Sequence, residues 1–281
     1  MKSKNFDKEK GWKTSQMDLY DGWAKRPKIK PLSPFWKFYG NFEGEVEITF
    51  LDEVAGKMAL DMGCRDARFV SQLISKKANV IGIDLSINCI KLAQQKIAKY
   101  GKDKADFIVC DAEKLPFRQG IFDYVTILFL LHHLSNFHVL GEAQYVLKQT
   151  GTLLLNEPVR NNFIVVLGSK IYPLLFPSIR AKMLQDPEDN PKHTKERSIF
   201  SISKIEKALH VAKFSIIMKE GQHLFLFPLE HLIRLLPALR FIFTDQILFS
   251  LYHIEKKMLK KGFGNSGRYI IIKCKKQDLY T

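Results

Sequence analysis

Short apolar runs alternate with stretches of helical spacing through the middle of this chain. The runs Met58–Leu60 and Val80–Ile83 each end at an aspartate, Asp61 and Asp84, and a turn centred on Gly63 and a helical stretch separate them. This order predicts a strand, a turn, a helix and a second, parallel strand. The carboxyl ends of parallel strands line the ligand crevice of an open sheet, so we expect both aspartates to face a ligand.

Further apolar runs extend the predicted sheet. Asp106–Cys110 predicts a third strand, the unbroken apolar run Tyr124–Leu131 predicts a fourth strand buried on both faces, and Gly151–Glu157 predicts a fifth. Phe214–Glu220 predicts a sixth strand, and Gly267–Lys275 predicts a seventh, antiparallel strand at the edge of the sheet. The expected fold is therefore α/β, a Rossmann-like doubly wound sheet with an antiparallel last strand and a helical cap inserted near the C-terminus.

The turn after the first strand differs from the G-x-G-x-x-G pattern of dinucleotide sites. Gly63 is kept, but Arg65 and Ala67 follow it. A pyrophosphate needs close approach to the backbone, so a nucleoside cofactor without phosphates fits this turn better. Gly63 and Asp84 are 21 residues apart, which matches the spacing of about 20 between a glycine turn and an acid that binds ribose hydroxyls.

Five short motifs stand in register between residues 58 and 157. Over this stretch the chain resembles class I methyltransferases that use S-adenosylmethionine, and among them the small-molecule branch typified by the ubiquinone and menaquinone type. The motifs that carry the resemblance are Asp61-x-Gly63-Cys64, Asp84 after an apolar strand, Asp111-Ala112 before Leu-Pro-Phe, Phe122-Asp123, and His133-Leu134.

The resemblance implies a role for each motif. Asp61 would hold the amino group at the methionine end of the cofactor, Asp84 would accept the ribose hydroxyls, and Asp111 would accept the adenine amino group. Tyr20 lies in an aromatic and acidic segment that in family members folds over the cofactor, although such a segment could also only tie down the N-terminal arm. The residues expected to bind S-adenosylmethionine are Asp61, Gly63, Cys64, Arg65, Asp84, Leu85, Asp111, Ala112, Leu128 and Tyr20.

Two positions depart from the family pattern, which usually has glycine where this chain has Arg65 and Ala67. A side chain there is costly if the backbone needs a positive φ. We expect the departure to weaken cofactor binding more than folding. Arg65 would either tilt into solvent or contact the carboxylate of the cofactor.

The chemistry of such a site requires little from the protein beyond geometry. A sulfonium methyl is already electrophilic, so the enzyme must hold a nucleophile in line and exclude water. A general base is needed only for a hydroxyl or an acidic carbon. His133, ahead of His132, is the candidate base because histidine titrates near neutral pH; Glu157, at the end of the fifth strand, points to the acceptor side.

The net charge bears on which partners this chain could bind, and the cysteine content bears on metal sites and on location. The net charge is +15, and residues 159–281 contribute +11 of it from 21 basic and 10 acidic residues. An anionic membrane surface, an anionic substrate and nucleic acid each fit this excess, as does a lysine-rich surface without a partner. The four cysteines show no C-x-x-C spacing, so we expect free thiols, no metal site and a reducing, cytoplasmic location.

The chain divides into three predicted regions. Residues 1–40 form a basic arm and linker whose beginning is expected to be disordered, residues 41–158 form the cofactor-binding core, and residues 159–281 form a cap on the acceptor side with the last helix and strands. The apolar insertion His223–Lys261 fits a packed cap, a homodimer interface or a helix lying in a membrane surface. No apolar stretch is long enough to span a bilayer, so any membrane contact would be peripheral.

These features predict methyl transfer from S-adenosylmethionine to a small-molecule acceptor. The apolar cap would suit an acceptor that is lipid-linked or isoprenoid. A first alternative is a catalytically degraded member of the fold that serves as a partner-binding or membrane-binding subunit, because Arg65 and Ala67 alter the turn. A second alternative is an RNA methyltransferase, which the positive charge suggests. Nucleic acid is the weaker choice, because the Asn/Asp-Pro-Pro-Tyr/Phe segment of base methyltransferases does not follow the fourth predicted strand.

Overall fold

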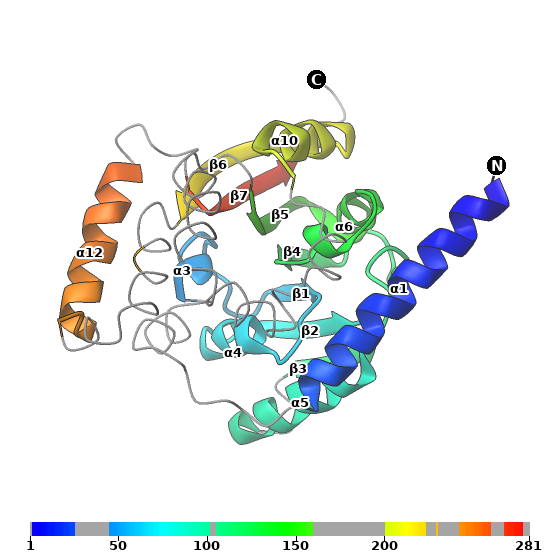
Figure 1. Cartoon of the computed structure of the whole chain (residues 1–281), viewed down its shortest axis with the longest axis horizontal. Coiled ribbons are helices and arrows are strands. Elements are labelled where there is room, and N and C mark those ends of the chain that lie inside the picture. The colour runs from blue at the N-terminus through cyan, green and yellow to red at the C-terminus, as the bar shows by residue number, and fades with distance from the viewer. Residues whose placement is uncertain are drawn as a thin grey trace, which may run out of the picture.

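The computed structural model describes residues 2–25, 45–101, 105–159, 200–222, 229, 242–259 and 267–277. Its described strands form a seven-stranded sheet in the order β3-β2-β1-β4-β5-β7-β6 (Figure 1). The strands are β1 Met58–Met62, β2 Asn79–Asp84, β3 Ala105–Val109, β4 Phe122–Leu128, β5 Leu147–Pro158, β6 Phe214–Gln222 and β7 Tyr269–Lys276.

The predicted doubly wound sheet is confirmed, with one correction to the position of its last strand. The pairs β1–β2, β1–β4, β2–β3 and β4–β5 are parallel, and β7 runs antiparallel to both β5 and β6. The last strand is therefore antiparallel, as expected, but β6 and not β7 lies at the edge. Burial explains the difference, because the run from Ile270 to Ile272 is fully buried whereas Ile216, Ile217 and Met218 of β6 are exposed.

Helices cover both faces of this sheet. One hydrophobic cluster joins Val125 and Ile127 of β4 to α6 and α10, and a second joins Tyr124 and Leu154 to α4 and α5. Because neighbouring residues of β4 and β5 point to opposite covered faces, these strands read as unbroken apolar runs. The helices are α1 Lys2–Ala24, α3 Glu45–Ile48, α4 Arg68–Ser75, α5 Ile87–Ile97, α6 His138–Val146, α10 Ile202–Val211 and α12 Asp245–Met258, with short 3-10 turns η1 Ala98–Tyr100 and η2 Leu131–His133.

The beginning of the N-terminal arm is helical, contrary to the expectation that it is disordered. Helix α1 spans Lys2–Ala24 and lies beside α5, across the carboxyl ends of the first strands (Figure 1). Few of its residues are apolar, so its own pattern does not predict a buried face. Several of its contacts are instead polar or aromatic and are made with segments about a hundred residues away in the chain.

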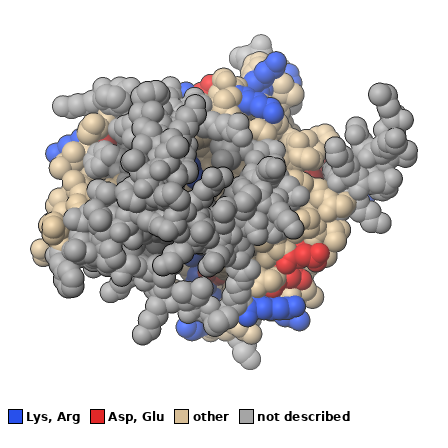
Figure 2. All heavy atoms as spheres, viewed as in Figure 1, with Lys and Arg blue, Asp and Glu red and all other residues tan. Residues whose placement is uncertain are grey.

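Much of the predicted cap lies outside the described residues. Of the insertion His223–Lys261, the structure describes Leu229 and residues 242–259, which include α12. None of the described helices is long and apolar enough to cross a membrane. In Figure 2 the Lys and Arg side chains of the described residues that can be seen lie in separate groups around the rim of this face.

Candidate cofactor and acceptor site

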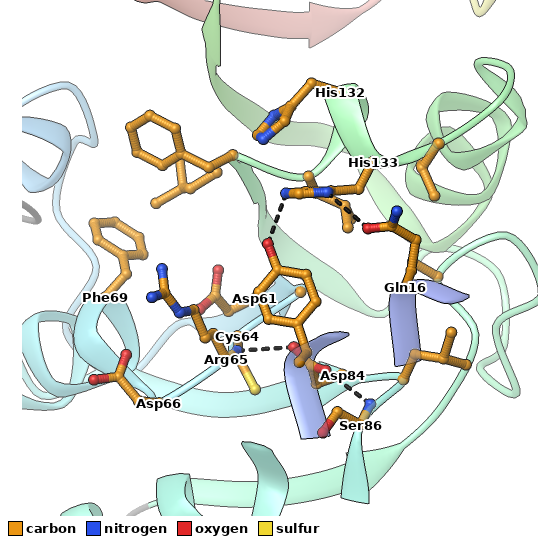
Figure 3. A pocket seen from close by; sticks show the side chains of 18 of the residues that line it. Gln16, Asp61, Cys64, Arg65, Asp66, Phe69, Asp84, Ser86, His132 and His133 are labelled. Carbon is orange, nitrogen blue, oxygen red and sulfur yellow. Dashed lines mark hydrogen bonds between the residues drawn. The ribbon is translucent and has the colours of Figure 1, made fainter. Parts of the chain in front are cut away.

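A cavity of about 400 Å³ opens at the carboxyl ends of β1, β2 and β4, beneath α1 (Figure 3). Its volume lies within the range of about 300–1,000 Å³ that is usual for small-molecule sites. His132 and His133 border it, whereas Glu157 does not and lies behind His132. All ten residues that the sequence predicts for the cofactor line this cavity: Asp61, Gly63, Cys64, Arg65, Asp84, Leu85, Asp111, Ala112, Leu128 and Tyr20.

The turn after β1 keeps the backbone of a glycine turn although only its first glycine, Gly63, is present. Gly63, Arg65 and Ala67 have φ of 78°, 50° and 57°. A Cβ on Gly63 would lie 3.1 Å from Leu130 Cδ1, so a side chain there would meet the floor of the cavity. The two departures from the family pattern therefore stand at positions where a side chain strains the backbone.

Asp84 is fixed at the end of β2 by two backbone donors (Figure 3). The Arg65 N–H donates to its Oδ2 at 3.0 Å, and the Ser86 N–H donates to its Oδ1 at 2.9 Å. Burial raises the pKa of this carboxyl, while the two N–H donors oppose the shift. A carboxylate held in this way presents its remaining lone pairs in a fixed direction.

Asp61 is the most deeply buried of the three acids, with 3% of its surface exposed. The Thr126 hydroxyl donates to its Oδ1 at 2.6 Å. Burial raises the pKa of Asp61 to about 7, although the Thr126 hydrogen bond lowers it. A buried carboxyl of this kind favours a cationic ligand, because a positive charge repays the cost of ionising it.

Asp111 is joined to α1 through Lys13. The Lys13 Nζ lies 2.7 Å from Asp111 Oδ2 and 2.7 Å from Glu113 Oε2. The Glu113 N–H donates to the other oxygen of Asp111 at 2.9 Å. The third acid of the cavity is therefore held in place from both the loop after β3 and the N-terminal helix.

Helix α1 forms the roof of the cavity through side chains spaced four residues apart. Trp12 Nε1 donates to the His133 carbonyl at 2.7 Å, Gln16 Oε1 lies 2.9 Å from His133 Nδ1, and Tyr20 Oη lies 2.7 Å from His133 Nε2. Asp21 is hydrogen-bonded to the Ser86 hydroxyl. Tyr20 thus lines the cavity and also ties the arm to it, and its expected contact with the cofactor stays a prediction.

Sequence reasoning missed four residues of this roof. A spacing of four residues marks one face of a helix, and that spacing was the only indication of them in the sequence. At the far end of α1, the centroid of the Trp23 ring lies 3.8 Å from the guanidinium carbon of Arg65. The missed cavity residues are Trp12, Lys13, Gln16 and Met17.

The two adjacent histidines have different partners, although their rings lie only 3.9 Å apart. Both ring nitrogens of His133 face side chains of α1. His132 Nδ1 faces Glu157 Oε2 at 2.8 Å. This geometry does not favour His133 over His132 as a base, and the order of preference between them stays a prediction.

Glu157 is 1% exposed and receives several donors from the loop after β4. The Leu130 and Leu131 N–H groups donate to its Oε1 at 2.7 and 2.6 Å, and the His132 N–H donates to its Oε2 at 3.3 Å. Burial raises the pKa of Glu157 to about 8, and the backbone donors oppose that shift. The carboxyl therefore organises the chain around His132.

Within the described residues, no cluster of His, Cys, Asp and Glu is arranged to hold a metal ion. The four cysteines are free thiols. Cys64 lines the cavity, and burial raises its pKa well above the ordinary value. Neutral thiols are expected from such burial.

Comparison with known proteins agrees with this geometry. Residues 59–151 match the family model described as a methyltransferase domain. The demethylmenaquinone methyltransferase of Bacillus cereus (strain ATCC 10987 / NRS 248) is 31% identical over 111 residues, which are 38% of this chain and 47% of the relative. That of Bacillus cytotoxicus is 30% identical over 145 residues, 48% of this chain and 61% of the relative. The chain thus spans about half the length of the curated relatives it matches.

Solved structures share the fold at low identity. The [4+2]-cyclase SpnF has a TM-score of 0.56 at 20% identity, covering 86% of this chain and 83% of its own. A geranyl diphosphate methyltransferase in complex with SAM has a TM-score of 0.55 at 15% identity, covering 83% of this chain and 84% of its own. The fold, the acids at the strand ends and the family match identify residues 59–151 as a methyltransferase domain of the class I, S-adenosylmethionine-dependent type.

Proposed function

We propose that this protein binds S-adenosylmethionine in the cavity and transfers its methyl group to a small-molecule acceptor. The observation that carries the proposal is the convergence of Asp61, Asp84 and Asp111, from the ends of three neighbouring strands, on one cavity of about 400 Å³. Acids at the carboxyl ends of parallel strands are the groups that a nucleoside with an amino-acid tail requires.

The chemistry of each acid fits one part of the cofactor. The buried Asp61 carboxyl suits the ammonium group, Asp84 suits the two ribose hydroxyls, and Asp111 suits the adenine amino group. When bound, the cofactor supplies an electrophilic methyl group on a sulfonium. The protein supplies the rest, since α1 covers the cavity and would exclude water from it once the cofactor is bound.

We further propose a lipid-linked or isoprenoid acceptor that is reached at a membrane surface. The curated relatives are named for demethylmenaquinone and a structural neighbour for geranyl diphosphate. Helix α12 exposes Ile247, Ile254 and Met258 on one side, and Lys256 and Lys257 lie in its last turn. An exposed apolar face beside lysines suits the headgroup region of an anionic bilayer.

Co-sedimentation with vesicles tests the membrane part of the proposal. The wild type should bind phosphatidylserine vesicles, and Ile254→Ser combined with Met258→Ser should weaken this binding, while neutral vesicles should bind poorly. The alternative occupant of the same face is a second copy of the chain. A dimer in light scattering that dissociates in the double variant, without vesicle binding, would favour the homodimer instead.

Methyl transfer tests the function itself. The protein is incubated with methyl-labelled S-adenosylmethionine and either demethylmenaquinol in anionic vesicles or total RNA, and label in each fraction is counted. Label in the quinol supports the proposal. Label in RNA alone would support the RNA methyltransferase, and a folded protein that binds no cofactor in calorimetry would support the non-catalytic, partner-binding subunit.

A further inference from the structure

The C-terminal end of α1 contacts the same two residues that hold Asp84 in place. The N–H groups of Arg65 and Ser86 donate to the Asp84 carboxyl at 3.0 and 2.9 Å (Figure 3). The Arg65 guanidinium carbon lies 3.8 Å from the centroid of the Trp23 ring. The Ser86 hydroxyl donates to Asp21. The position of the last turn of α1 is therefore tied to the backbone that fixes Asp84.

Arg65 occupies the turn after β1 at a conformational cost. Its φ is 50°, in the left-handed region that glycine adopts freely and other residues avoid. Such strain persists where the surroundings hold the residue in place. A glycine would remove the strain, but it would also remove the side chain that contacts Trp23.

The contact between Arg65 and Trp23 joins two side chains that suit each other. Tryptophan has the aromatic ring that attracts a cation most strongly, and arginine is the cation most often found over such a ring. Trp23 is partly buried, whereas Gly22 and Lys25 on either side of it are exposed. The ring is therefore turned toward the turn after β1 and away from solvent.

Other contacts of α1 lie along the rest of the cavity. Gln16 and Tyr20 meet His133 at the acceptor end, and Lys13 meets Asp111 after β3. The contact with Arg65 adds an attachment at the turn after β1. A ligand beneath a covering segment leaves faster when an attachment of that segment is lost.

We propose that Arg65 is a positioning residue that latches the last turn of α1 onto the turn after β1 through Trp23, and so lengthens the time that the cofactor stays bound. The inference rests on the proposed function and deepens it. It assigns the Arg65 side chain to retention of the cofactor and not to direct contact with the cofactor carboxylate.

The rate at which a ligand leaves the cavity tests this inference. The full chain is loaded with radiolabelled S-adenosylhomocysteine and chased with an excess of unlabelled ligand. Arg65→Gly keeps the N–H that donates to Asp84, yet it should release the label about 2–30 times faster than the wild type, the range that corresponds to a cation–π contact. Trp23→Leu should do the same. The double variant should be no faster than the faster single variant, because both substitutions remove one contact.

Lys77→Gly is the matched control for the change in backbone strain. Lys77 has a φ of 64° and is exposed in the turn between α4 and β2. Its replacement relieves a similar strain away from the cavity, so this variant should release S-adenosylhomocysteine at the wild-type rate.

A ligand without the amino-acid tail separates a latch from a direct contact. 5′-Methylthioadenosine shares the nucleoside of S-adenosylhomocysteine but has no carboxylate. A latch retains both ligands, so Arg65→Gly should release both of them faster. Faster release of S-adenosylhomocysteine alone would show that Arg65 binds the carboxylate, and this would overturn the inference.

Hydrogen exchange separates the latch from simple support of the turn. In Arg65→Gly with S-adenosylhomocysteine bound, the backbone amides at the end of α1 should exchange faster than in the wild type, whereas those of α4, which follows the turn, should not. Faster exchange in α4 with α1 unchanged would mean that Arg65 only supports the turn, which contradicts the latch.

Three further results would decide against the inference. Release of S-adenosylhomocysteine from Arg65→Gly at the wild-type rate contradicts the latch. Additive effects of the two substitutions contradict the pairing of Arg65 with Trp23; if Trp23→Leu does not fold, Arg65→Gly with the two ligands still decides the question. A folded wild type that does not bind S-adenosylhomocysteine contradicts the proposed function first, and this inference with it.

Discussion

The two ends of the cavity are built in different ways. At the cofactor end, Asp61 and Asp84 stand directly at the ends of β1 and β2, and backbone groups hold the turn between them. At the acceptor end, β4, β5, β7 and α1 each contribute side chains, and Tyr20 meets His133 across 113 residues of sequence. The geometry of the cofactor end is set by the sheet itself. The geometry of the acceptor end depends on long-range contacts that another sequence could change without changing the fold.

The largest effect on cofactor binding is expected from removing Asp84, the acid proposed to bind the ribose hydroxyls. Asp84→Ala should weaken binding of S-adenosylmethionine at least about 100-fold, because two hydrogen bonds to a charged group contribute about 1.5–3 kcal/mol each. Isothermal titration calorimetry measures this change. Asp106→Ala, at an exposed acid in β3, is the matched control and should bind normally. Equal affinity of the two variants for S-adenosylmethionine would show that Asp84 does not contact the cofactor.

A pH dependence should distinguish Asp61 from the other acids. Its pKa is raised to about 7 by burial, and the cofactor ammonium favours the ionised form. Affinity for S-adenosylhomocysteine should therefore rise with pH, by up to about tenfold per unit below pH 7, and level off above it until the ligand amine loses its proton. Calorimetry across this range gives the profile.

A substitution beside Asp61 sharpens that test. Thr126→Val removes the hydroxyl that favours the ionised carboxyl, so the whole profile should move to higher pH. Thr49→Val, at an exposed hydroxyl that donates to the Val46 carbonyl, should leave it in place. A flat profile in the wild type would mean that Asp61 does not meet the ammonium.

A smaller effect is expected at the roof. Tyr20→Phe removes the hydroxyl that meets His133, and a hydrogen bond of this kind contributes about 0.5–1.5 kcal/mol. Dissociation of S-adenosylhomocysteine should become about 2–10 times faster. Stopped-flow fluorescence can follow it, because Trp12 and Trp23 lie on α1. Tyr145→Phe, at an exposed tyrosine of α6, should dissociate at the wild-type rate, and an identical rate in Tyr20→Phe would mean that α1 does not close the site.

The smallest effect concerns the strained turn. Ala67 is buried with a φ of 57°, so Ala67→Gly should raise the free energy of unfolding by up to about 1 kcal/mol. Ala55→Gly, in an exposed turn of ordinary φ, should lower it by about 0.4–1 kcal/mol through the unfolded state. Denaturant unfolding compares them. A clear loss of stability in Ala67→Gly would show that the side chain contributes more than the backbone strain costs.

The same contrast explains how much could be predicted from the sequence. The strands and the acids at their ends follow from local apolar runs, so the sheet and the acids that line the cavity were predicted. The place of β7 inside the sheet was not predicted. A short apolar run alone does not distinguish an internal strand from one at the edge of the sheet. Helix α1 was not predicted either, since its polar side chains are ordered by the cavity they cover and not by an apolar face of their own.

A crystal structure of the complex with S-adenosylhomocysteine tests the central claim most directly. The decisive measurement is the distance from the two ribose hydroxyl oxygens to the carboxylate of Asp84. The account predicts about 2.5–3.0 Å for both, with the sulfur directed toward His132 beneath the roof of α1. Ribose hydroxyls bound away from Asp84, or a ligand outside this cavity, would contradict it.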